Sequence, residues 1–223
     1  MTMNNDRAFS AVIPARSGSS LADKNLRQLG GESLLARAVR ICLESKIFEQ
    51  VIVSSDSEGY LDHVDGKGVT LHRRAREAAS DSATAQDVVD DLAELVSGTH
   101  LFYLQPTSPH RRTSHIQIAA KMVESNPDSH IISVCRLNQH PSKVLLSENE
   151  WVKPVEPGSL HLNRLADATF WYPNGAIYVL PRSNGKFSFS TDRYRPFIMN
   201  REDSLDIDTE EDFTLGEIIE SAK

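Results

Sequence analysis

Short apolar runs alternate with longer amphipathic segments through most of the chain. Short apolar runs are typical of buried strands, whereas apolar residues three and four positions apart are typical of one helix face. The predicted strands are residues 11–13, 51–53, 68–71, 101–104 and 131–134, and the predicted helices are residues 32–46, 84–96 and 113–124. This alternation indicates βαβ units and a mainly parallel sheet, so we expect an α/β fold.

Three of the predicted strands end in polar residues. The segments Pro14-Ala15-Arg16, Ser54-Ser55-Asp56 and Gln105-Pro106-Thr107 each follow an apolar run directly. In open α/β sheets, ligands bind at the carboxyl ends of the strands. We therefore expect these three segments to meet at a binding site. For Ser54-Ser55-Asp56, capping of the strand end is an equally good interpretation.

The pattern changes at about residues 136–174. Prolines are frequent in this segment, and helical spacing is missing. The short apolar runs at 144–146 and 151–152 favour a β-ribbon that leaves the main sheet as a lid or a dimer arm. We expect one domain over residues 1–223, with this arm as an insertion.

The remainder of the chain returns to regular structure. Asn174-Gly175 is expected to turn the chain back into a strand at 176–180, and residues 197–199 are the last predicted strand. Thr209-Glu210-Glu211-Asp212 has the spacing of a capping box, which predicts the start of a final helix over 213–221.

Composition excludes several classes of protein. With 223 residues and a formal net charge of -7, the chain lacks the basic stripe of a nucleic-acid binder. No apolar run approaches the roughly 20 residues of a membrane span. The polar start of the chain shows no signal peptide, so cytoplasm is the expected location. Cys42 and Cys135 are expected as small core residues of a reducing compartment.

Arginines nevertheless cluster locally, and we expect these clusters to form anion sites in an acidic protein. They are Arg73, Arg74 and Arg76; Arg111 and Arg112; and Arg193 and Arg195.

The first candidate site is the loop that follows Ile13. A buried strand that opens into a turn of small residues leaves backbone N–H groups unpaired, and such turns bind anions. Arg16 and Lys24 place a positive charge on either side of this turn, which predicts a triphosphate site. The alternative is a surface loop with two solvated basic residues, because neither phosphate-binding glycine motif has its required spacing here.

The second candidate site is Asp206-Ile207-Asp208. On extended backbone, side chains two positions apart point to the same side, so the two carboxylates are expected to lie together. Paired carboxylates facing a triphosphate are typical of a Mg²⁺ site. The alternative is that one of them supports the N-terminus of the following helix, although Thr209 already occupies the cap position.

Seven motifs in order give the chain a resemblance to the CMP-sialate synthetases (N-acylneuraminate cytidylyltransferases) and, more distantly, to the CMP-Kdo synthetases. They are Ile13-Pro14-Ala15-Arg16 with Lys24-Asn25-Leu26; Ile52-Val53-Ser54-Ser55-Asp56; Ala79-Ser80-Asp81-Ser82-Ala83; Leu104-Gln105-Pro106-Thr107-Ser108-Pro109; His140-Pro141-Ser142-Lys143; Pro173-Asn174-Gly175-Ala176-Ile177-Tyr178; and Asp206-Ile207-Asp208-Thr209. The resemblance implies a Rossmann-like nucleotidyltransferase domain. It also implies a homodimer in which the arm reaches into the partner's site.

The resemblance also implies roles for individual residues. The residues implied to bind the nucleotide are Ala15, Arg16, Ser17, Lys24, Asn25, Arg74 (or Arg73), Ala83, Thr84 and Asn174. The residues implied to act in catalysis are Arg16, Lys24 and Asp208. The residues implied to bind the sugar acid are Gln105, Lys143, Arg164, Tyr172 and Asp206. Those implied to bind Mg²⁺ are Asp206 and Asp208.

The implied reaction is transfer of CMP from CTP to the anomeric hydroxyl of an acidic keto-sugar, with release of pyrophosphate. Two departures from the family concern the loop, which is one residue shorter than usual and carries Ser20-Leu21 where Lys-Gly is common. Tyr172 stands where the sialate enzymes often carry arginine. Legionaminate, Kdo or another small acid is therefore an alternative acceptor, and a non-catalytic nucleotide-binding module is an alternative to an enzyme.

Overall fold

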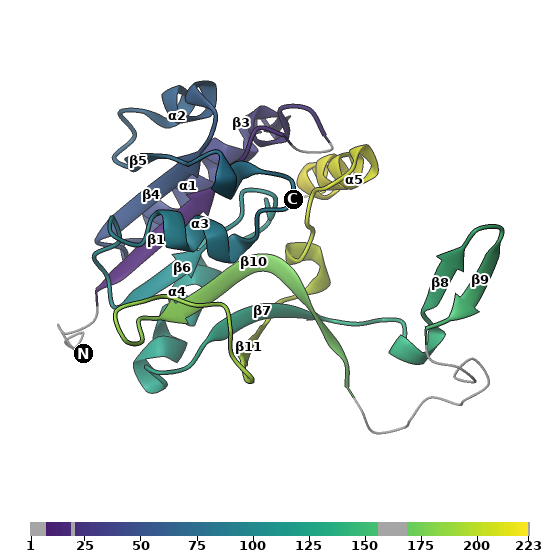
Figure 1. Cartoon of the computed structure of the whole chain (residues 1–223). Helices are drawn as coiled ribbons and strands as arrows, with labels where there is room; N and C mark the ends of the chain where they lie inside the picture. Colours follow the sequence, from purple (N-terminus) through teal and green to yellow (C-terminus); the bar gives the residue numbers. More distant parts are fainter. Residues whose placement is uncertain (1–7, 19–20, 156–168, 223) are drawn as a thin grey trace.

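A seven-stranded sheet forms the centre of the protein, in the order β11-β7-β10-β6-β1-β4-β5 (Figure 1). We describe it from a computed structural model that covers residues 8–18, 21–155 and 169–222. The strands are β1 Phe9–Pro14, β4 Gln50–Ser55, β5 Thr70–Arg73, β6 His100–Tyr103, β7 Ile131–Arg136, β10 Trp171–Pro181 and β11 Arg195–Ile198. All neighbours pair in parallel except β10, which runs antiparallel to both β6 and β7. The predicted mainly parallel sheet is confirmed.

Helices cover both faces of this sheet. They are α1 Leu34–Ser45, α2 Glu58–Val64, α3 Ala85–Asp91, α4 Thr113–Ser125 and α5 Glu210–Ser221. Alternation along β1 shows the two layers: Ala11 and Ile13 belong to the apolar cluster shared with α1, α2 and α4, whereas Val12 packs with Val88 of α3. Within the described residues, no helix is long and apolar enough to span a membrane.

Helix α3 is shorter than predicted. Thr84 caps it as expected, but it ends at Asp91 rather than at residue 96. Leu92 and Val96 are buried all the same, in the cluster that α3 shares with the sheet. The apolar spacing therefore identified Leu92 and Val96 correctly as buried, and the turns after Asp91 bury them without continuing the helix. Leu95, which belongs to the same predicted apolar side, is exposed.

Asn174-Gly175 is not the turn that the sequence predicted. The strand β10 already joins β7 at Trp171, and its pairing is irregular between Pro173 and Tyr178. Gly175 has a φ of 73° at this irregularity, a conformation that glycine adopts without strain. The dipeptide is thus a bulge inside a long strand, and the insertion closes earlier than predicted, where Leu137 N–H donates to Phe170 O.

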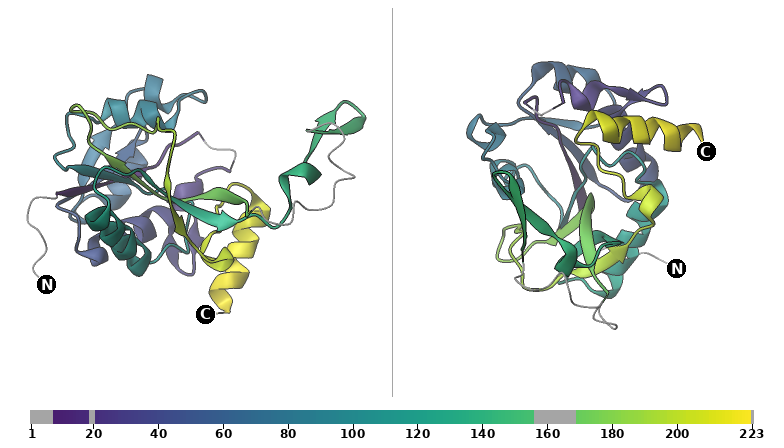
Figure 2. Two further views of the ribbon diagram at one scale, coloured as in Figure 1. Left: turned by 90° about the horizontal axis from the view of Figure 1, so that it is seen from below. Right: turned by 90° about the vertical axis from the view of Figure 1, so that its right-hand side faces the viewer.

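The predicted β-ribbon is present as the hairpin of β8 Leu145–Glu148 and β9 Trp151–Pro154. It projects away from the sheet, as Figure 1 and the left view of Figure 2 show. Its apolar side chains are in solvent, and Trp151 is 78% exposed. Exposed apolar clusters of this kind are typical of interaction surfaces.

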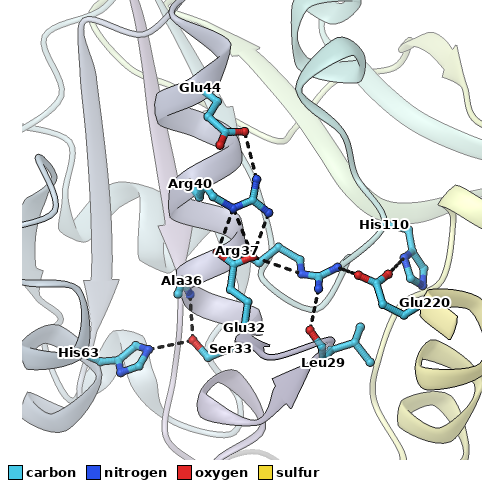
Figure 3. Close-up of polar contacts among 10 residues, drawn as sticks. All are labelled: Leu29, Glu32, Ser33, Ala36, Arg37, Arg40, Glu44, His63, His110 and Glu220. Atoms are coloured by element: carbon cyan, nitrogen blue, oxygen red, sulfur yellow. Dashed lines mark hydrogen bonds and ion pairs between the residues drawn. The ribbon is translucent and has the colours of Figure 1, made fainter. Parts of the chain in front are cut away.

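The C-terminal helix is fixed to the N-terminal half of the chain. Arg37 of α1 donates to Glu220 Oε1 of α5 at 2.6 Å and to the backbone oxygen of Leu29, and His110 Nδ1 lies 3.6 Å from Glu220 Oε2 (Figure 3). Phe213 of α5 packs with Leu29 in a separate apolar cluster. These contacts place the segment before α5 next to the loop after β1.

The Arg37–Glu220 pair is expected to contribute strongly to stability, because the Arg37 side chain is only 10% exposed. Arg37→Met removes the Arg37 guanidinium from the partly buried Glu220 carboxylate and from the Leu29 carbonyl. We expect the free energy of unfolding to fall by about 3 kcal/mol, measured by urea denaturation. Arg40→Met is the matched control on the same helix, since Arg40 is 47% exposed, and it should cost about 0.5 kcal/mol. Equal losses in the two variants would contradict this assignment.

Candidate active site

A pocket of about 400 Å³ lies at the carboxyl ends of β1 and β6. Its lining residues come from segments far apart in the sequence. They include Arg16, Lys24, Asn25, Arg74, Ala83, Thr84, Gln105 and Asp208, all predicted, together with Ala78, Ser80, Val88 and Tyr103. The expected meeting of the basic loop, the ends of β1 and β6 and the late acidic segment is therefore observed, whereas Ser54-Ser55-Asp56 is not part of the lining.

Lys24 and Asp208 join the two ends of the chain across this pocket. Lys24 lies in the short 3-10 helix η1 (Lys24–Leu26), and its Nζ is 2.8 Å from Asp208 Oδ1. The Lys24 side chain is 7% exposed and that of Asp208 is 68% exposed. The pair thus buries its cation and presents its carboxylate to the pocket.

The loop after β1 is held by contacts to residues 80–81 and to Asp56, which follows β4. Arg16 donates to Ser80 O and to Asp81 Oδ1, at 3.1 Å and 2.9 Å. Ser17 donates from both its N–H and its hydroxyl to Asp56. Partial burial on its own would raise the pKa of Asp56, but the hydrogen bonds from Ser17 outweigh it and hold that pKa below its usual value. Asp56 therefore fixes the loop.

Two loop residues predicted to contact the nucleotide lie outside the pocket lining. Ala15 is fully buried, and its N–H continues the sheet by donating to Ser54 O. Ser17 uses its backbone N–H on Asp56. The cationic side chain of Arg16, between them, does line the pocket.

Of the two adjacent arginines, Arg74 lines the pocket and Arg73 does not. Arg73 forms an ion pair with Glu58 at the surface. Arg74 is buried, and its guanidinium donates to the hydroxyl and the backbone oxygen of Ser54 at 3.2 Å and 2.7 Å. Nearby, Asn25 Nδ2 donates to Arg16 O, while its buried Oδ1 has no hydrogen-bond partner in the described part of the chain. That oxygen is available for a ligand donor.

Asp206 lies beside the pocket, next to Gln105. Ile207 N–H donates to Thr107 O at 2.8 Å, which fixes this segment to the end of β6. A Cβ added to Gly175 would meet Gln105 Oε1 at 2.6 Å and Asp206 Oδ2 at 3.0 Å. Burial raises the pKa of Asp206, and the negative charge of Asp208 acts in the same direction. A cation bound between the two carboxylates would offset their mutual repulsion.

The donor set fits a hard divalent cation such as Mg²⁺. Asp206 Oδ1 is buried and, among the residues described, accepts no hydrogen bond. The described ranges hold no cluster of three or more His, Cys, Asp or Glu side chains that could bind a metal by themselves. Mg²⁺ is usually held by one or two carboxylates together with substrate phosphates, and the Asp206–Asp208 pair fits this donor set.

Other predicted residues are not brought to the pocket lining. Asn174 is buried and uses its amide on Ser133 and Ser204, as well as on Met199 and on its own strand. Tyr172 pairs with Cys135 across β7 and β10. Lys143 lies in the arm, in the 3-10 helix η3 (Pro141–Lys143). Arg164 lies outside the described residues.

Arg111 and Arg112, predicted to form an anion site, both line a second cavity of about 230 Å³ with Arg37 and Arg40, but each already donates to acceptors of the protein. Arg111 is almost fully buried, and its Nη1 donates to the backbone oxygens of Gln105 and Ala176. Arg112 pairs with the buried carboxylate of Asp203 at 2.7 Å. Arg111 thus supports the end of β6 and the bulge of β10, whereas Arg112 fixes the segment that contains Asp203. Nothing in the sequence distinguishes such arginines from ligand-binding ones.

Comparisons with known proteins agree with this geometry. The chain is 32% identical over 209 residues to the N-acylneuraminate cytidylyltransferase of Streptococcus agalactiae serotype V, which covers 91% of this chain and 51% of that relative. It is 30% identical over 221 residues to the CMP-N,N'-diacetyllegionaminic acid synthase of Legionella pneumophila, covering 93% of this chain and 94% of that one. This chain thus spans about half the length of several curated relatives but nearly all of another.

A solved structure shows the same fold. CMP:2-keto-3-deoxy-manno-octonic acid synthetase complexed with CTP matches with a TM-score of 0.70 and 17% identity, over 96% of this chain and 99% of that one. The family model described as cytidylyltransferase matches residues 10–157. The chain belongs to the cytidylyltransferase family.

Proposed function

We propose that the protein transfers CMP from CTP to the anomeric hydroxyl of an acidic keto-sugar. One observation carries the proposal: Arg16, Lys24 and Asp208 share a single pocket with Gln105. Cations suit a triphosphate, and the carboxylate suits its metal ion. The named activities of the relatives support this choice of reaction.

In the proposed reaction, the anomeric oxygen attacks the α-phosphorus in line, and the bond to the pyrophosphate oxygen breaks. No covalent enzyme intermediate is needed, so the protein contributes positioning and charge neutralisation. Arg16 and Lys24 would neutralise the phosphates of CTP and stabilise the departing pyrophosphate. Their existing contacts to Asp81 and Asp208 hold both cations at the pocket.

The nucleoside would occupy the part of the pocket between η2 (Glu77–Ala79) and the N-terminus of α3. Arg74, Ala83 and Thr84 line this part, and Asn25 offers its Oδ1. We place the base and ribose against these residues. Ala15, Ser17 and Asn174 would act from behind them, by fixing the backbone.

Mg²⁺ is the proposed cofactor, held by Asp206 and Asp208. When bound, such an ion neutralises phosphate charge and lowers the pKa of the attacking hydroxyl. Asp208 would keep its contact with Lys24, so that the Lys24 ammonium and the metal-binding carboxylate both stay beside the phosphates.

The sugar acid would lie beside Gln105, with Tyr172 on the adjoining part of β10. We propose that the protein is a homodimer whose arm brings Lys143 and Arg164 to the carboxylate in the partner's site. The exposed apolar side chains of the hairpin support a second copy as the partner. The buried free cysteines Cys42 and Cys135 support a cytoplasmic location.

The decisive experiment measures pyrophosphate release from CTP and Mg²⁺ with separate acceptors: N-acetylneuraminate, legionaminate, Kdo and simple acids. We expect release with a nonulosonate. Release with one acid alone identifies the acceptor. CTP binding without release with any of them would favour a non-catalytic binding module and contradict the proposal.

Lys143→Ala tests the role of the arm. We expect the KM for the sugar acid to rise about tenfold and the KM for CTP to change less than twofold, because one charge-assisted contact to a carboxylate is lost. Lys153→Ala is the matched control, since Lys153 pairs with Glu148 within the hairpin. An effect confined to CTP would contradict the placement of Lys143.

A further inference from the structure

A chain of polar contacts leads away from the pocket behind Arg74. Arg74 Nε donates to Ser54 Oγ at 3.2 Å, and Ser54 Oγ lies 3.0 Å from His72 Nδ1. On the far side of the ring, His72 Nε2 lies 3.7 Å from Asp91 Oδ2. Asp91 in turn accepts from Ala75 N–H at 2.9 Å. Three segments, the ends of β4 and β5 and the last residue of α3, therefore meet behind one arginine of the pocket.

The chemistry of these groups determines which atom donates and which accepts in each contact. The Ser54 hydroxyl has one hydrogen, and its oxygen already accepts from Arg74. The hydrogen can then be donated to His72 Nδ1 only if that nitrogen is unprotonated. The carboxylate of Asp91 favours the ring proton on Nε2, which leaves Nδ1 as the acceptor. A neutral His72 thus accepts the Ser54 hydrogen, whereas a protonated His72 would donate to the Ser54 oxygen and force the hydroxyl hydrogen to turn elsewhere.

We infer that His72 is a positioning residue for nucleotide binding, which acts through Ser54 to hold the Arg74 guanidinium in the pocket. The inference rests on the proposed function, because it takes CTP as the ligand. Neutral His72 fixes the serine hydroxyl so that its oxygen faces Arg74, which lines the pocket. Protonated His72 would reverse the hydrogen bond to the serine, turn the hydroxyl hydrogen elsewhere, and add a second cation beside Arg74.

The charges around His72 agree with a neutral ring at neutral pH. Burial lowers its pKa, the Asp91 carboxylate from α3 raises it, and the Arg74 guanidinium lowers it again. The net shift is downward, so His72 is neutral at pH 7 and becomes protonated as the pH falls below its ordinary titration range. Ser54, the contact from β4, is uncharged and fully buried.

The experiment measures the Kd of CTP by calorimetry between pH 5.5 and 8 for the unsubstituted chain and two variants. His72→Asn keeps an acceptor oxygen close to the position of Nδ1 and does not titrate. His72→Leu removes the acceptor, and its fold is checked by circular dichroism. The terminal phosphate of CTP titrates with a pKa of about 6 and affects all three proteins alike. The ratio of the Kd of the unsubstituted chain to the Kd of His72→Asn, followed over pH, therefore reports the protonation of His72 alone.

We expect His72→Asn to bind CTP within about twofold of the unsubstituted chain at pH 7.5, and His72→Leu to bind about tenfold more weakly. At pH 5.5 the unsubstituted chain should lose affinity relative to His72→Asn. Asp91→Asn should shift that loss to lower pH, because its negative charge no longer raises the pKa of His72.

Two results would overturn the inference alone. One is an unchanged Kd in His72→Leu, and the other is a pH profile of His72→Asn that matches the unsubstituted chain. If the unsubstituted chain binds no CTP at any pH, the proposed function is wrong and this inference falls with it. Binding of CTP with either of the first two results leaves the proposed function intact.

Discussion

Asp208→Asn is expected to lower kcat by about a hundredfold to a thousandfold, with the fold unchanged. Asparagine has the same shape and still accepts from Lys24 Nζ, so the contact across the pocket persists in weaker form. The negative charge is lost, and with it one of the two carboxylates that we propose as ligands of Mg²⁺. Because the Asp208 side chain is 68% exposed, the substitution has little effect on packing. The measurement is pyrophosphate release at saturating CTP and acceptor.

Glu210→Gln is the matched control for this substitution. Glu210 lies two residues further on, at the start of α5, and pairs with Arg27 at 2.7 Å. It is outside the pocket lining, so kcat should stay within about twofold, as for other exposed ion pairs. Normal turnover of Asp208→Asn, or equal losses in both variants, would remove Asp208 from the reacting centre.

The fold was largely predictable because short continuous apolar runs are characteristic of strands buried on both faces. In Val51-Ile52-Val53, Ile52 packs on the α3 face of the sheet, and Val51 and Val53 pack on the opposite face. All three side chains are buried. The direction of β10 was not predictable. It follows the long arm, and nothing in the local pattern of residues 171–181 fixes which way the returning strand runs.

The candidate site was predictable where it follows from the architecture. Arg16 and Gln105 come directly after strands, and in a parallel sheet such residues meet whatever their separation in sequence. Asn174 and Arg111 show the limit of that reasoning. Both carry side chains typical of ligand contacts, yet both are buried and hydrogen-bonded to neighbours that only the packing brings together. Their burial depends on tertiary contacts, which residue type and spacing do not encode.

Gly175→Ala is expected to lower kcat/KM for the sugar acid by about a hundredfold, because displacements of about 1 Å in a reacting centre have effects of this size. The new Cβ would lie 2.6 Å from Gln105 Oε1 and 3.0 Å from Asp206 Oδ2. Both distances are too short, so the Gln105 amide and the Asp206 carboxylate must move. These are the groups that we place at the acceptor and at the metal ion. Steady-state kinetics with each substrate varied in turn measures the effect.

Gly185→Ala separates this displacement from backbone strain. Gly175 has a φ of 73° and Gly185 a φ of 80°, so alanine should cost each about 1–2 kcal/mol of stability. No atom lies within 4 Å of a Cβ added to Gly185. Both variants should therefore melt at lower temperature, but only Gly175→Ala should lose activity. If Gly185→Ala loses as much activity as Gly175→Ala, strain alone explains the effect; if neither loses activity, Gln105 and Asp206 do not need their present positions.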